Sequence, residues 1–310
     1  MFTHHCRRWI AVALLATGRL LFGEPPAPTY AVSPFAQFLT DHGYVQTQVN
    51  STGRNQDLVQ ACINGSVGTL ALDTGCGRTC ITDGFARRLK LDVQKGSSLV
   101  GAGGKVAGAG MAALTSFTLN NIAINRISTI EVLPPHVAVP KDGLLGYDYM
   151  RLNAMILPVG RSFLLYKPGP APPAEFDSFL KALGYSAIPL TFGEGGLRAT
   201  GSLDGHPLIA IVDCGATFSL FDSTFVKNTV GALVSKSSMV YWGIDGRPMY
   251  VDYFQAGKLT FGALTFPPTT STATNGTTLN AIHAQALLGY DLLAVHKAII
   301  DLGHDVLWMK

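Results

Sequence analysis

Two aspartates, Asp73 and Asp213, stand at corresponding places in two similar stretches of sequence. The first stretch reads LALDTGCGRTCI (residues 70–81) and the second reads AIVDCGATFSLF (residues 210–221), so each aspartate ends an apolar run and precedes a small residue and a glycine. A buried carboxylate costs free energy unless it is paired or hydrogen-bonded. Two carboxylates brought together would share one proton, and the ionised one could act as a general base toward water. The repetition therefore predicts one site that uses both aspartates.

Other catalytic chemistries lack their motifs in this chain. The sequence contains no G-x-S-x-G elbow and no H-E-x-x-H motif, which disfavours elbow-type serine hydrolases and zinc peptidases. His283, His296 and His304 lack metal-ligand spacing and are expected at the surface or at helix ends. The cysteines lack paired C-x-x-C knuckles. We therefore expect no metal and no cofactor, and the pairing of the cysteines stays open.

The element that positions each aspartate is predicted to be a β-hairpin. Asn64-Gly65 and Asp204-Gly205 each stand upstream of an aspartate, and each glycine precedes its aspartate by eight residues. Asn-Gly and Asp-Gly favour two-residue hairpin turns because both turn positions take positive φ. The second strand of each hairpin would then deliver the aspartate.

The correspondence between the halves continues downstream. Leu-Leu-Gly-Tyr-Asp occurs at 144–148 and again at 287–291, each time before a short helical stretch and an apolar strand. Glycine-containing hairpin candidates lie between the motifs, with tips near Gly104-Lys105 and Gly246-Arg247. Four features in the same order indicate a tandem duplication. Short alternating runs with turn signals predict an all-β fold, with helices expected at 83–89, at 222–230 and after each Leu-Leu-Gly.

Asp-Thr-Gly followed about 70 residues later by Leu-Leu-Gly resembles the retropepsin-like aspartic proteases, including bacterial members with two such units per chain. The resemblance covers 56–310. It implies two acid-protease β-barrel lobes of the retropepsin and pepsin type, meeting along a cleft with Asp73 and Asp213 as the catalytic dyad. It also implies that the Leu-Leu-Gly strands cross behind the active loops. The loop residues Thr74, Gly75, Cys214 and Gly215 would support the dyad, and Gly104, Lys105, Gly246 and Arg247 would lie in two flaps.

The second copy departs from the family pattern at Cys214, where the family has Thr or Ser. A thiol is a weaker hydrogen-bond donor than a hydroxyl, so the lock between the two loops is expected to be looser. Cys76 replaces the usual Ala of the first copy. We expect Cys76 and Cys214 to lie near each other, either as packed thiols or as a redox-sensitive pair. Asp148 and Asp291 are expected to open the following helices rather than to act in catalysis.

The resemblance implies an aspartic endopeptidase that hydrolyses a peptide or protein substrate as a monomer. One alternative is a pseudoprotease that binds extended peptides without cutting them, which the Cys214 replacement favours. A second alternative is a homodimer in which each lobe pairs with a lobe of another chain. The formal net charge of +3 and the absence of a basic cluster exclude nucleic acid from the expected partners.

The chain is predicted to have five segments. Residues 1–31 are interpreted as a signal peptide, because Arg7 and Arg8 precede a short apolar run, and an uncleaved membrane anchor through 9–22 stays open. Export to the periplasm or outside the cell is therefore expected. The remaining segments are an N-terminal lead-in (32–55), the first lobe (56–166), a Pro-rich linker with a short helix (167–187) and the second lobe (188–310).

Overall fold

The computed structural model describes residues 33–52, 56–101, 104–119, 122–123, 128–137, 139, 141–167, 171–193, 195–230, 235–242, 248–274 and 278–310. The expected signal peptide or anchor (1–31) and the expected flap residues Gly246 and Arg247 lie outside the described residues. None of the helices within the described ranges is long and apolar enough to cross a membrane.

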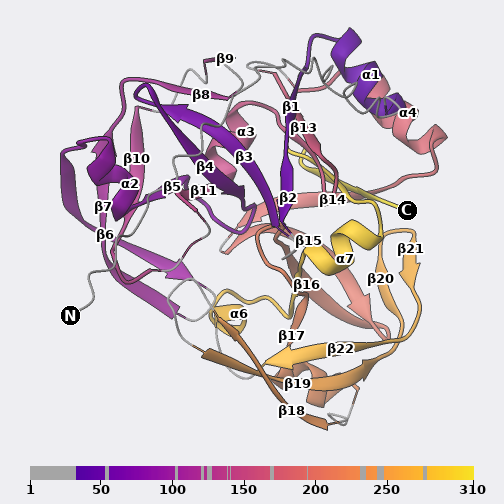
Figure 1. Ribbon diagram of the computed structural model, residues 1–310. Helices are drawn as coiled ribbons and strands as arrows, with labels where there is room; N and C mark the ends of the chain where they lie inside the picture. Colours follow the sequence, from indigo (N-terminus) through magenta and orange to yellow (C-terminus); the bar gives the residue numbers. More distant parts are fainter. Residues whose placement is uncertain are drawn as a thin grey trace, which may run out of the picture. The chain divides into compact units, whose positions relative to one another are not determined.

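Strands make up most of the regular structure (Figure 1). The strands are β1 (Val45–Gln48), β2 (Asn50–Thr52), β3 (Gln56–Ile63), β4 (Ser66–Leu72), β5 (Cys80–Thr82), β6 (Val93–Gly101), β7 (Gly104–Ala113), β8 (Phe117–Leu119), β9 (Ile122–Ala123), β10 (Thr129–Leu133), β11 (Gly143–Leu145), β12 (Ile156–Pro158), β13 (Phe163–Tyr166), β14 (Ser186–Gly193), β15 (Gly196–Leu203), β16 (His206–Val212), β17 (Leu220–Asp222), β18 (Ser235–Trp242), β19 (Pro248–Ala256), β20 (Leu259–Phe261), β21 (Leu264–Phe266), β22 (Thr269–Thr274), β23 (Ala286–Leu288), β24 (Ile299–Asp301) and β25 (Val306–Met309).

The helices are short and few. They are α1 (Pro34–Asp41), α2 (Asp83–Arg88), α3 (Tyr147–Leu152), α4 (Glu175–Ala182), α5 (Ser223–Thr229), α6 (Thr278–Ala281) and α7 (Tyr290–Val295). Helices α2, α5, α3 and α7 confirm those expected at 83–89, at 222–230 and after each Leu-Leu-Gly. Helix α4 confirms the helix expected within the Pro-rich linker. The mostly-β composition agrees with the all-β prediction.

The two hairpins that lead to the aspartates form as predicted. Strands β3 and β4 pair around Asn64 and Gly65, whose φ angles are 48° and 79°. Strands β15 and β16 pair around Asp204 and Gly205, whose φ angles are 51° and 83°. Positive φ at both positions is the requirement of a tight hairpin turn, and Asn, Asp and Gly meet it with the least strain.

Strand pairing around each aspartate follows the same pattern in the two halves. Strand β4, which ends before Asp73, runs parallel to β11, and β11 pairs antiparallel with β5. In the second half β16 runs parallel to β23, and β23 pairs antiparallel with β17. Each Leu-Leu-Gly motif therefore begins as a strand inserted between the strand before the aspartate and the strand after the active loop. This arrangement fixes both ends of each loop.

Strands from both halves meet in one sheet. Strand β12 pairs antiparallel with β24, and their register places Leu157 opposite Ile300. The order of the larger sheet is β1-β13-β12-β24-β25-β14-β15-β16-β23-β17-β22-β19-β18, with β20 and β21 joined to it through β15. The order of the other sheet is β6-β7-β10-β5-β11-β4-β3-β8-β9, with β2 on β3. Among the described strands neither order returns to its beginning. The sheets are therefore open, and the expectation of closed barrels is corrected.

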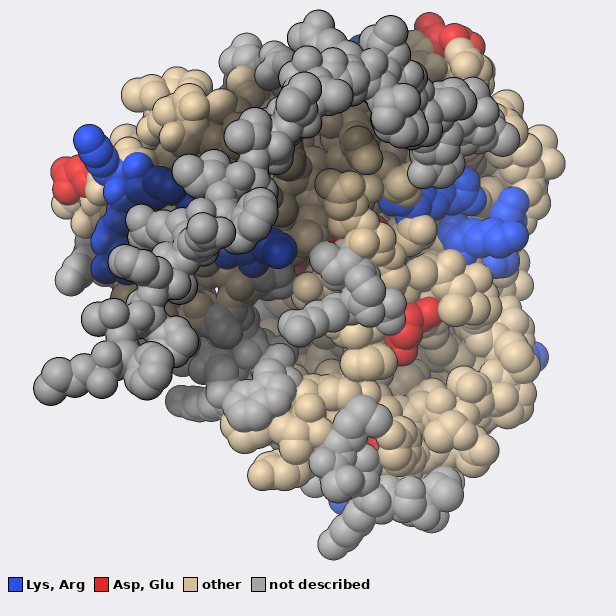
Figure 2. Space-filling model, in the orientation of Figure 1, with Lys and Arg blue, Asp and Glu red and all other residues tan. Residues whose placement is uncertain are grey.

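The N-terminal lead-in is part of this architecture. Strand β1 pairs with β13, and helix α1 packs beside α4 through the ring of Phe38. That ring stacks on Phe176 and Phe179, with centroid separations of 5.8 Å and 4.7 Å. The apolar cluster under these helices includes Trp308 of β25, which is fully buried. On the face shown in Figure 2, the described Lys and Arg side chains form separate groups rather than one continuous surface.

Candidate active site

The two active loops, 73–79 and 213–219, are anchored at both ends by the Leu-Leu-Gly segments. The N–H of Asp73 donates to the Leu145 carbonyl at 3.1 Å, and the N–H of Asp213 donates to the Leu288 carbonyl at 3.0 Å. Farther along, Tyr147 donates to the carbonyl of Cys76 at 2.8 Å. The corresponding bond in the second half, from Tyr290 to Ala216, is also 2.8 Å. Both loops are thus held in the same way.

Glycine is required in both Leu-Leu-Gly motifs because the active loop passes too close for a side chain. A Cβ atom on Gly146 would lie 2.6 Å from the carbonyl carbon of Arg78. A Cβ atom on Gly289 would lie 2.5 Å from the carbonyl carbon of Phe218. These atoms belong to the backbone, which cannot turn aside as a flexible side chain can.

The structure brings the carboxyl groups of Asp73 and Asp213 together, close enough for each to act on the pKa of the other. Each group is backed by a glycine of the other loop. A Cβ atom on Gly75 would lie 2.5 Å from Cγ of Asp213, and one on Gly215 would lie 2.4 Å from Cγ of Asp73. Gly75 and Gly215 therefore provide the space in which the two carboxyl groups meet, as expected for them.

Backbone N–H groups of the loops point at both carboxyl groups. Oδ1 of Asp73 accepts the N–H of Cys76 at 2.8 Å. Oδ1 of Asp213 accepts the N–H groups of Gly215 and Ala216 at 2.8 Å and 3.1 Å. These fixed donors orient the carboxyl groups and stabilise a single negative charge on the pair.

The electrostatics of the pair favour one shared proton. Burial raises the pKa of Asp73 well above its ordinary value, and the neighbouring charge of Asp213 raises it further. Burial also raises the pKa of Asp213, while the backbone N–H groups act in the opposite direction. Ionising both groups would place two negative charges in contact in a poorly solvated site. The pair therefore holds one proton and one negative charge over a range of pH in which isolated aspartates are fully ionised.

Thr74 and Cys214 lock the two loops together. The hydroxyl of Thr74 donates to the Val212 carbonyl at 2.9 Å and accepts the N–H of Cys214 at 3.0 Å. Thr74 is fully buried. Cys214 is also buried, and its backbone N–H is the donor that Thr74 accepts. Burial raises the pKa of the Cys214 thiol, so the thiol stays neutral in this contact. That the thiol of Cys214 makes the lock between the loops looser than a hydroxyl would stays a prediction.

Cys76 has a different neighbour from the expected one. Its thiol donates to the Arg78 carbonyl at 2.9 Å, and its side chain packs against the cluster that contains Cys80. The side chain of Cys214 lies instead between the loops, against Thr74. The structure therefore does not pair Cys76 with Cys214. The reason is that Cys76 comes after Thr74, which makes the contact between the two loops. The side chain of Cys76 instead packs toward β5, where Cys80 lies.

Asp148 and Asp291 lie in the first turns of α3 and α7, as expected, and they also tie each helix to its active loop. Oδ1 of Asp148 accepts the N–H and the hydroxyl of Thr79 at 2.7 Å and 2.8 Å. Oδ1 of Asp291 accepts the N–H and the hydroxyl of Ser219 at 2.9 Å and 2.7 Å. Sequence reasoning missed Thr79 and Ser219. The signal was a hydroxyl residue six positions after each aspartate of the dyad.

Replacing Thr79 by Val is expected to destabilise the protein by about 1–3 kcal/mol, because Asp148 loses a buried donor and Gly146 loses its acceptor. The Thr79 hydroxyl accepts the N–H of Gly146 at 2.9 Å, and Thr79 is 1% exposed. Urea unfolding would measure the loss. Thr79→Ser is the matched control, since it keeps the hydroxyl. A loss in Thr79→Ser as large as that in Thr79→Val would contradict the assignment.

The tyrosines of the two Leu-Leu-Gly-Tyr motifs reach across to the opposite half. The Tyr290 hydroxyl lies 3.2 Å from an oxygen of Asp57 and 3.1 Å from the hydroxyl of Ser51. The ring of Tyr147 stacks on Phe192 with a centroid separation of 4.2 Å. Burial raises the pKa of Asp57. These contacts were not predictable from the sequence, because the partners lie far apart along the chain.

Of the expected flap residues, Gly104 and Lys105 open β7 at the closed end of the β6–β7 hairpin. Gly101 pairs with Gly104, and Val100 pairs with Lys105. The corresponding hairpin in the second half is formed by β18 and β19, which pair antiparallel. Both copies therefore carry a hairpin at the predicted place.

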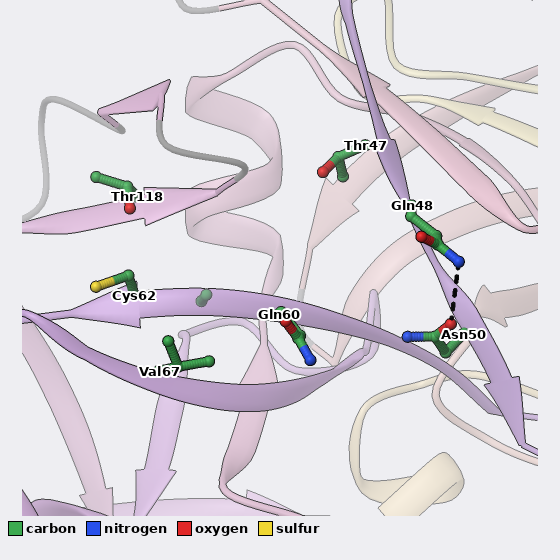
Figure 3. A pocket seen from close by; sticks show the side chains of 8 residues that line it. Thr47, Gln48, Asn50, Gln60, Cys62, Val67 and Thr118 are labelled. Carbon is green, nitrogen blue, oxygen red and sulfur yellow. Dashed lines mark hydrogen bonds between the residues drawn. The ribbon is translucent and has the colours of Figure 1, made fainter. Parts of the chain in front are cut away.

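A polar pocket lies outside the active loops, between β1, β3, β4 and β8 (Figure 3). Its volume is about 340 Å³, and the residues that line it are Thr47, Gln48, Asn50, Gln60, Ala61, Cys62, Val67 and Thr118. None of these residues belongs to 73–79 or 213–219, so the pocket shares no residue with the two active loops.

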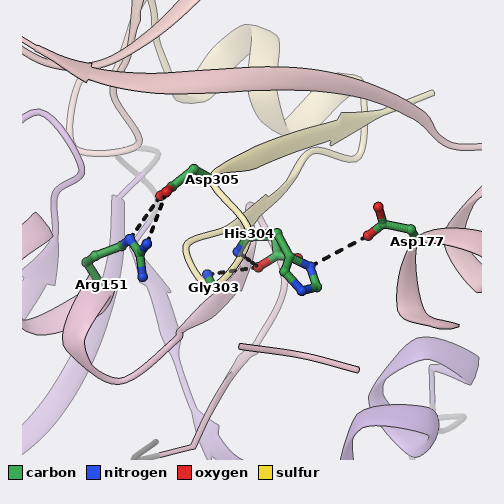
Figure 4. Close-up of polar contacts among 6 residues, drawn as sticks. Arg151, Asp177, Gly303, His304 and Asp305 are labelled. Atoms are coloured by element: carbon green, nitrogen blue, oxygen red, sulfur yellow. Dashed lines mark hydrogen bonds and ion pairs between the residues drawn. The ribbon is translucent and has the colours of Figure 1, made fainter. Parts of the chain in front are cut away.

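His304 is the histidine that meets carboxylates. Its Nδ1 lies 3.1 Å from Oδ2 of Asp301 and 3.6 Å from Oδ1 of Asp177 (Figure 4). The hydrogen bond to Asp301 raises the pKa of His304. Asp301 is fully buried and its other oxygen accepts the N–H of Gly303 at 2.9 Å. These contacts form an ion-paired cluster between the linker helix α4 and the β24–β25 turn.

A family model described as aspartyl protease matches residues 59–149. The matched segment contains Asp73-Thr74-Gly75 and the first Leu-Leu-Gly motif. The match supports the retropepsin-like aspartyl protease family and an aspartic-type peptidase activity in general. No curated protein matches the chain.

Proposed function

We propose that this chain is a single-chain aspartic endopeptidase in which two duplicated lobes each supply one carboxylate, Asp73 and Asp213, to a cleft between them. One observation carries the proposal: the two carboxyl groups lie together, and each is backed by the glycine of the opposite loop. The family match around Asp73 and the repeated strand pairing around Asp213 support it.

In the proposed mechanism a water molecule between the carboxyl groups is the nucleophile. The ionised carboxylate removes a proton from the water, and the protonated one donates a hydrogen bond to the scissile carbonyl. Water attacks directly, so no nucleophilic Ser or Cys is needed. The N–H groups of Cys76 and Gly215, which donate to the carboxyl groups of Asp73 and Asp213, hold those carboxyl groups in place while the proton moves. This is preorganisation of the kind that dominates enzymatic rate enhancement.

The substrate would be an extended peptide. Backbone groups at the edges of the β6–β7 and β18–β19 hairpins would pair with it as an added strand. The hairpins would then act as flaps and exclude water from the dyad. The lock formed by Thr74 joins both loops within one chain, which supports a monomer over a site shared between two chains.

The rival function is peptide binding without cleavage. The observation that favours it is Cys214, where a hydroxyl would complete the loop lock. The contact between Asp73 and Asp213 supports catalysis, since a relic has no need to keep two repelling carboxyl groups together at a cost in stability.

The test is cleavage of a mixed peptide library by the full chain from acidic to neutral pH. Asp73→Asn and Asp213→Asn are each expected to abolish cleavage. Asp92→Asn is the matched control, because Asp92 is exposed and its described hydrogen bond is with nearby Gln94. Cleavage that survives in both dyad variants would overturn the proposal. Retention of library peptides without cleavage by the parent would establish the binding function instead.

A further inference from the structure

The first active loop carries a pair of cysteines in contact, which the mechanism does not use. Cys76 packs against the cluster that contains Cys80, Cys80 raises the pKa of the Cys76 thiol, and both cysteines are free. Cys76 is partly exposed, whereas Cys80 is fully buried in β5. An oxidant would therefore meet Cys76 first and find the second thiol already beside it.

The second half shows that the fold itself brings these two positions together. Ala216 and Leu220 occupy the places that Cys76 and Cys80 occupy in the first half, three and seven residues after the aspartate. Ala216 packs against the cluster that contains Leu220, and Cys76 packs against the cluster that contains Cys80. An apolar contact in one copy is thus a dithiol in the other.

The pair is connected directly to the dyad. The N–H of Cys76 donates to Oδ1 of Asp73 at 2.8 Å, so any movement of Cys76 moves a donor of the catalytic carboxyl group. The thiol of Cys76 also donates to the Arg78 carbonyl within the same loop. Cys80 is fixed by the pairing of β5 with β10 and β11. Drawing the two sulfurs together must therefore displace the loop rather than the sheet.

We propose that Cys76 and Cys80 form a reversible disulfide beside the dyad, and that this bond slows peptide cleavage. The effect on cleavage rests on the proposed function, whereas formation of the bond does not. A disulfide has an S–S length of about 2.05 Å, shorter than any contact between two free thiols. Closing it removes the donor to Arg78 and shifts the Cys76 N–H away from Asp73. A displacement of about 1 Å at a catalytic group can cost about a hundredfold in rate.

The reaction is a thiol–disulfide exchange with an external small disulfide. The Cys76 thiolate attacks one sulfur of the oxidant, the S–S bond breaks, and the leaving thiolate takes up a proton. The Cys80 thiolate then attacks the sulfur of Cys76 and releases the second thiol. Two protein thiols are oxidised and one external disulfide is reduced to two thiols. The neighbouring Cys80 and burial raise the pKa of the Cys76 thiol, so the exchange is expected to accelerate toward alkaline pH.

The experiment treats the reduced full chain with oxidised glutathione at alkaline pH, alkylates the remaining thiols after unfolding, and maps the linked peptides by mass spectrometry. We expect Cys76 linked to Cys80, and at least a tenfold loss of library cleavage that dithiothreitol restores. In the Cys80→Ala variant the exchange is expected to stop after its first step, with a glutathione adduct on Cys76. Cys62→Ala, at the chain's other partly exposed described thiol, is the matched control and is expected to form the bond normally.

The outcomes separate the two proposals. Unmodified Cys76 and Cys80, a stable glutathione adduct in the parent, or a link from Cys76 to any other cysteine would overturn the disulfide. A Cys76–Cys80 bond without a change in cleavage rate would overturn its effect on the dyad. Failure of the reduced chain to cut any peptide would count against the proposed function, and the mapped bond would still stand.

Discussion

Gly75→Ala is expected to lower kcat/KM for peptide cleavage by about a hundredfold or more and to destabilise the protein. The new Cβ would lie 2.5 Å from Cγ of Asp213, well inside ordinary van der Waals contact. One of the two carboxyl groups must then move by about 1 Å, which is enough to cost about a hundredfold in rate. Overpacking of this kind also costs about 1–3 kcal/mol of stability. Library cleavage and urea unfolding would measure the two effects.

The same loop offers a matched control. A Cβ on Gly77 would have no heavy atom within 4 Å, and its φ is not in the left-handed region. Gly77→Ala is therefore expected to leave cleavage unchanged and stability within about 1 kcal/mol of the parent. Gly215→Ala should reproduce the loss from the other side, because its Cβ would lie 2.4 Å from Cγ of Asp73. Equal activity in Gly75→Ala and Gly77→Ala would contradict the close packing of the dyad.

The free energy of unfolding of Asp73→Asn, relative to that of the parent, is expected to increase as the pH rises from acidic to neutral. Burial and the neighbouring Asp213 raise the pKa of Asp73 in the folded chain, whereas an unfolded Asp titrates near 3.9. Between these two values the folded state binds more protons than the unfolded state, so the parent loses stability as pH rises. The loss amounts to about 1.4 kcal/mol for each unit between the two pKa values. Asn does not ionise and escapes this loss.

Urea unfolding of the parent and of Asp73→Asn at a series of pH values would measure this difference. The gap between the two curves should widen with pH and stop widening above the folded pKa of Asp73. Asp92→Asn, at an exposed position, should run parallel to the parent. A gap between the parent and Asp73→Asn that is constant with pH would show that Asp73 is not held in a protonated pair.

The features of the site that short sequence motifs determine were predictable. Asn64-Gly65 and Asp204-Gly205 specify their turns because the residues themselves tolerate positive φ, and each turn sets the register that ends at an aspartate. The similarity of the two stretches around Asp73 and Asp213 then implied that the aspartates meet. Helices α2, α3, α5 and α7 were predictable for the same reason, since each follows a recognisable turn or motif, whereas α1 and α6 were not predicted.

Contacts between distant residues were not predictable in this way. The bonds from Tyr290 to Asp57 and Ser51 join residues that no sequence pattern relates. The pairing of Cys76 with Cys80 rather than Cys214 depends on which way one side chain turns at the end of a loop. Separate closed barrels were expected, but the pairing of β12 with β24 produces one open sheet with strands of both halves, beside a second open sheet from the first half. Such outcomes depend on packing, which a single sequence does not display.

The pairing of β12 with β24 also bears on how the chain is made. The ribosome releases Leu157 about 140 residues before its partner Ile300. Throughout that interval the nascent first half presents an apolar strand whose backbone groups have no neighbour on that side, the kind of edge that invites aggregation. Pairing across such a separation is also slow, because a long loop must close first. The completed site is therefore a late product of folding, and the interval before it is when the polypeptide most needs a chaperone.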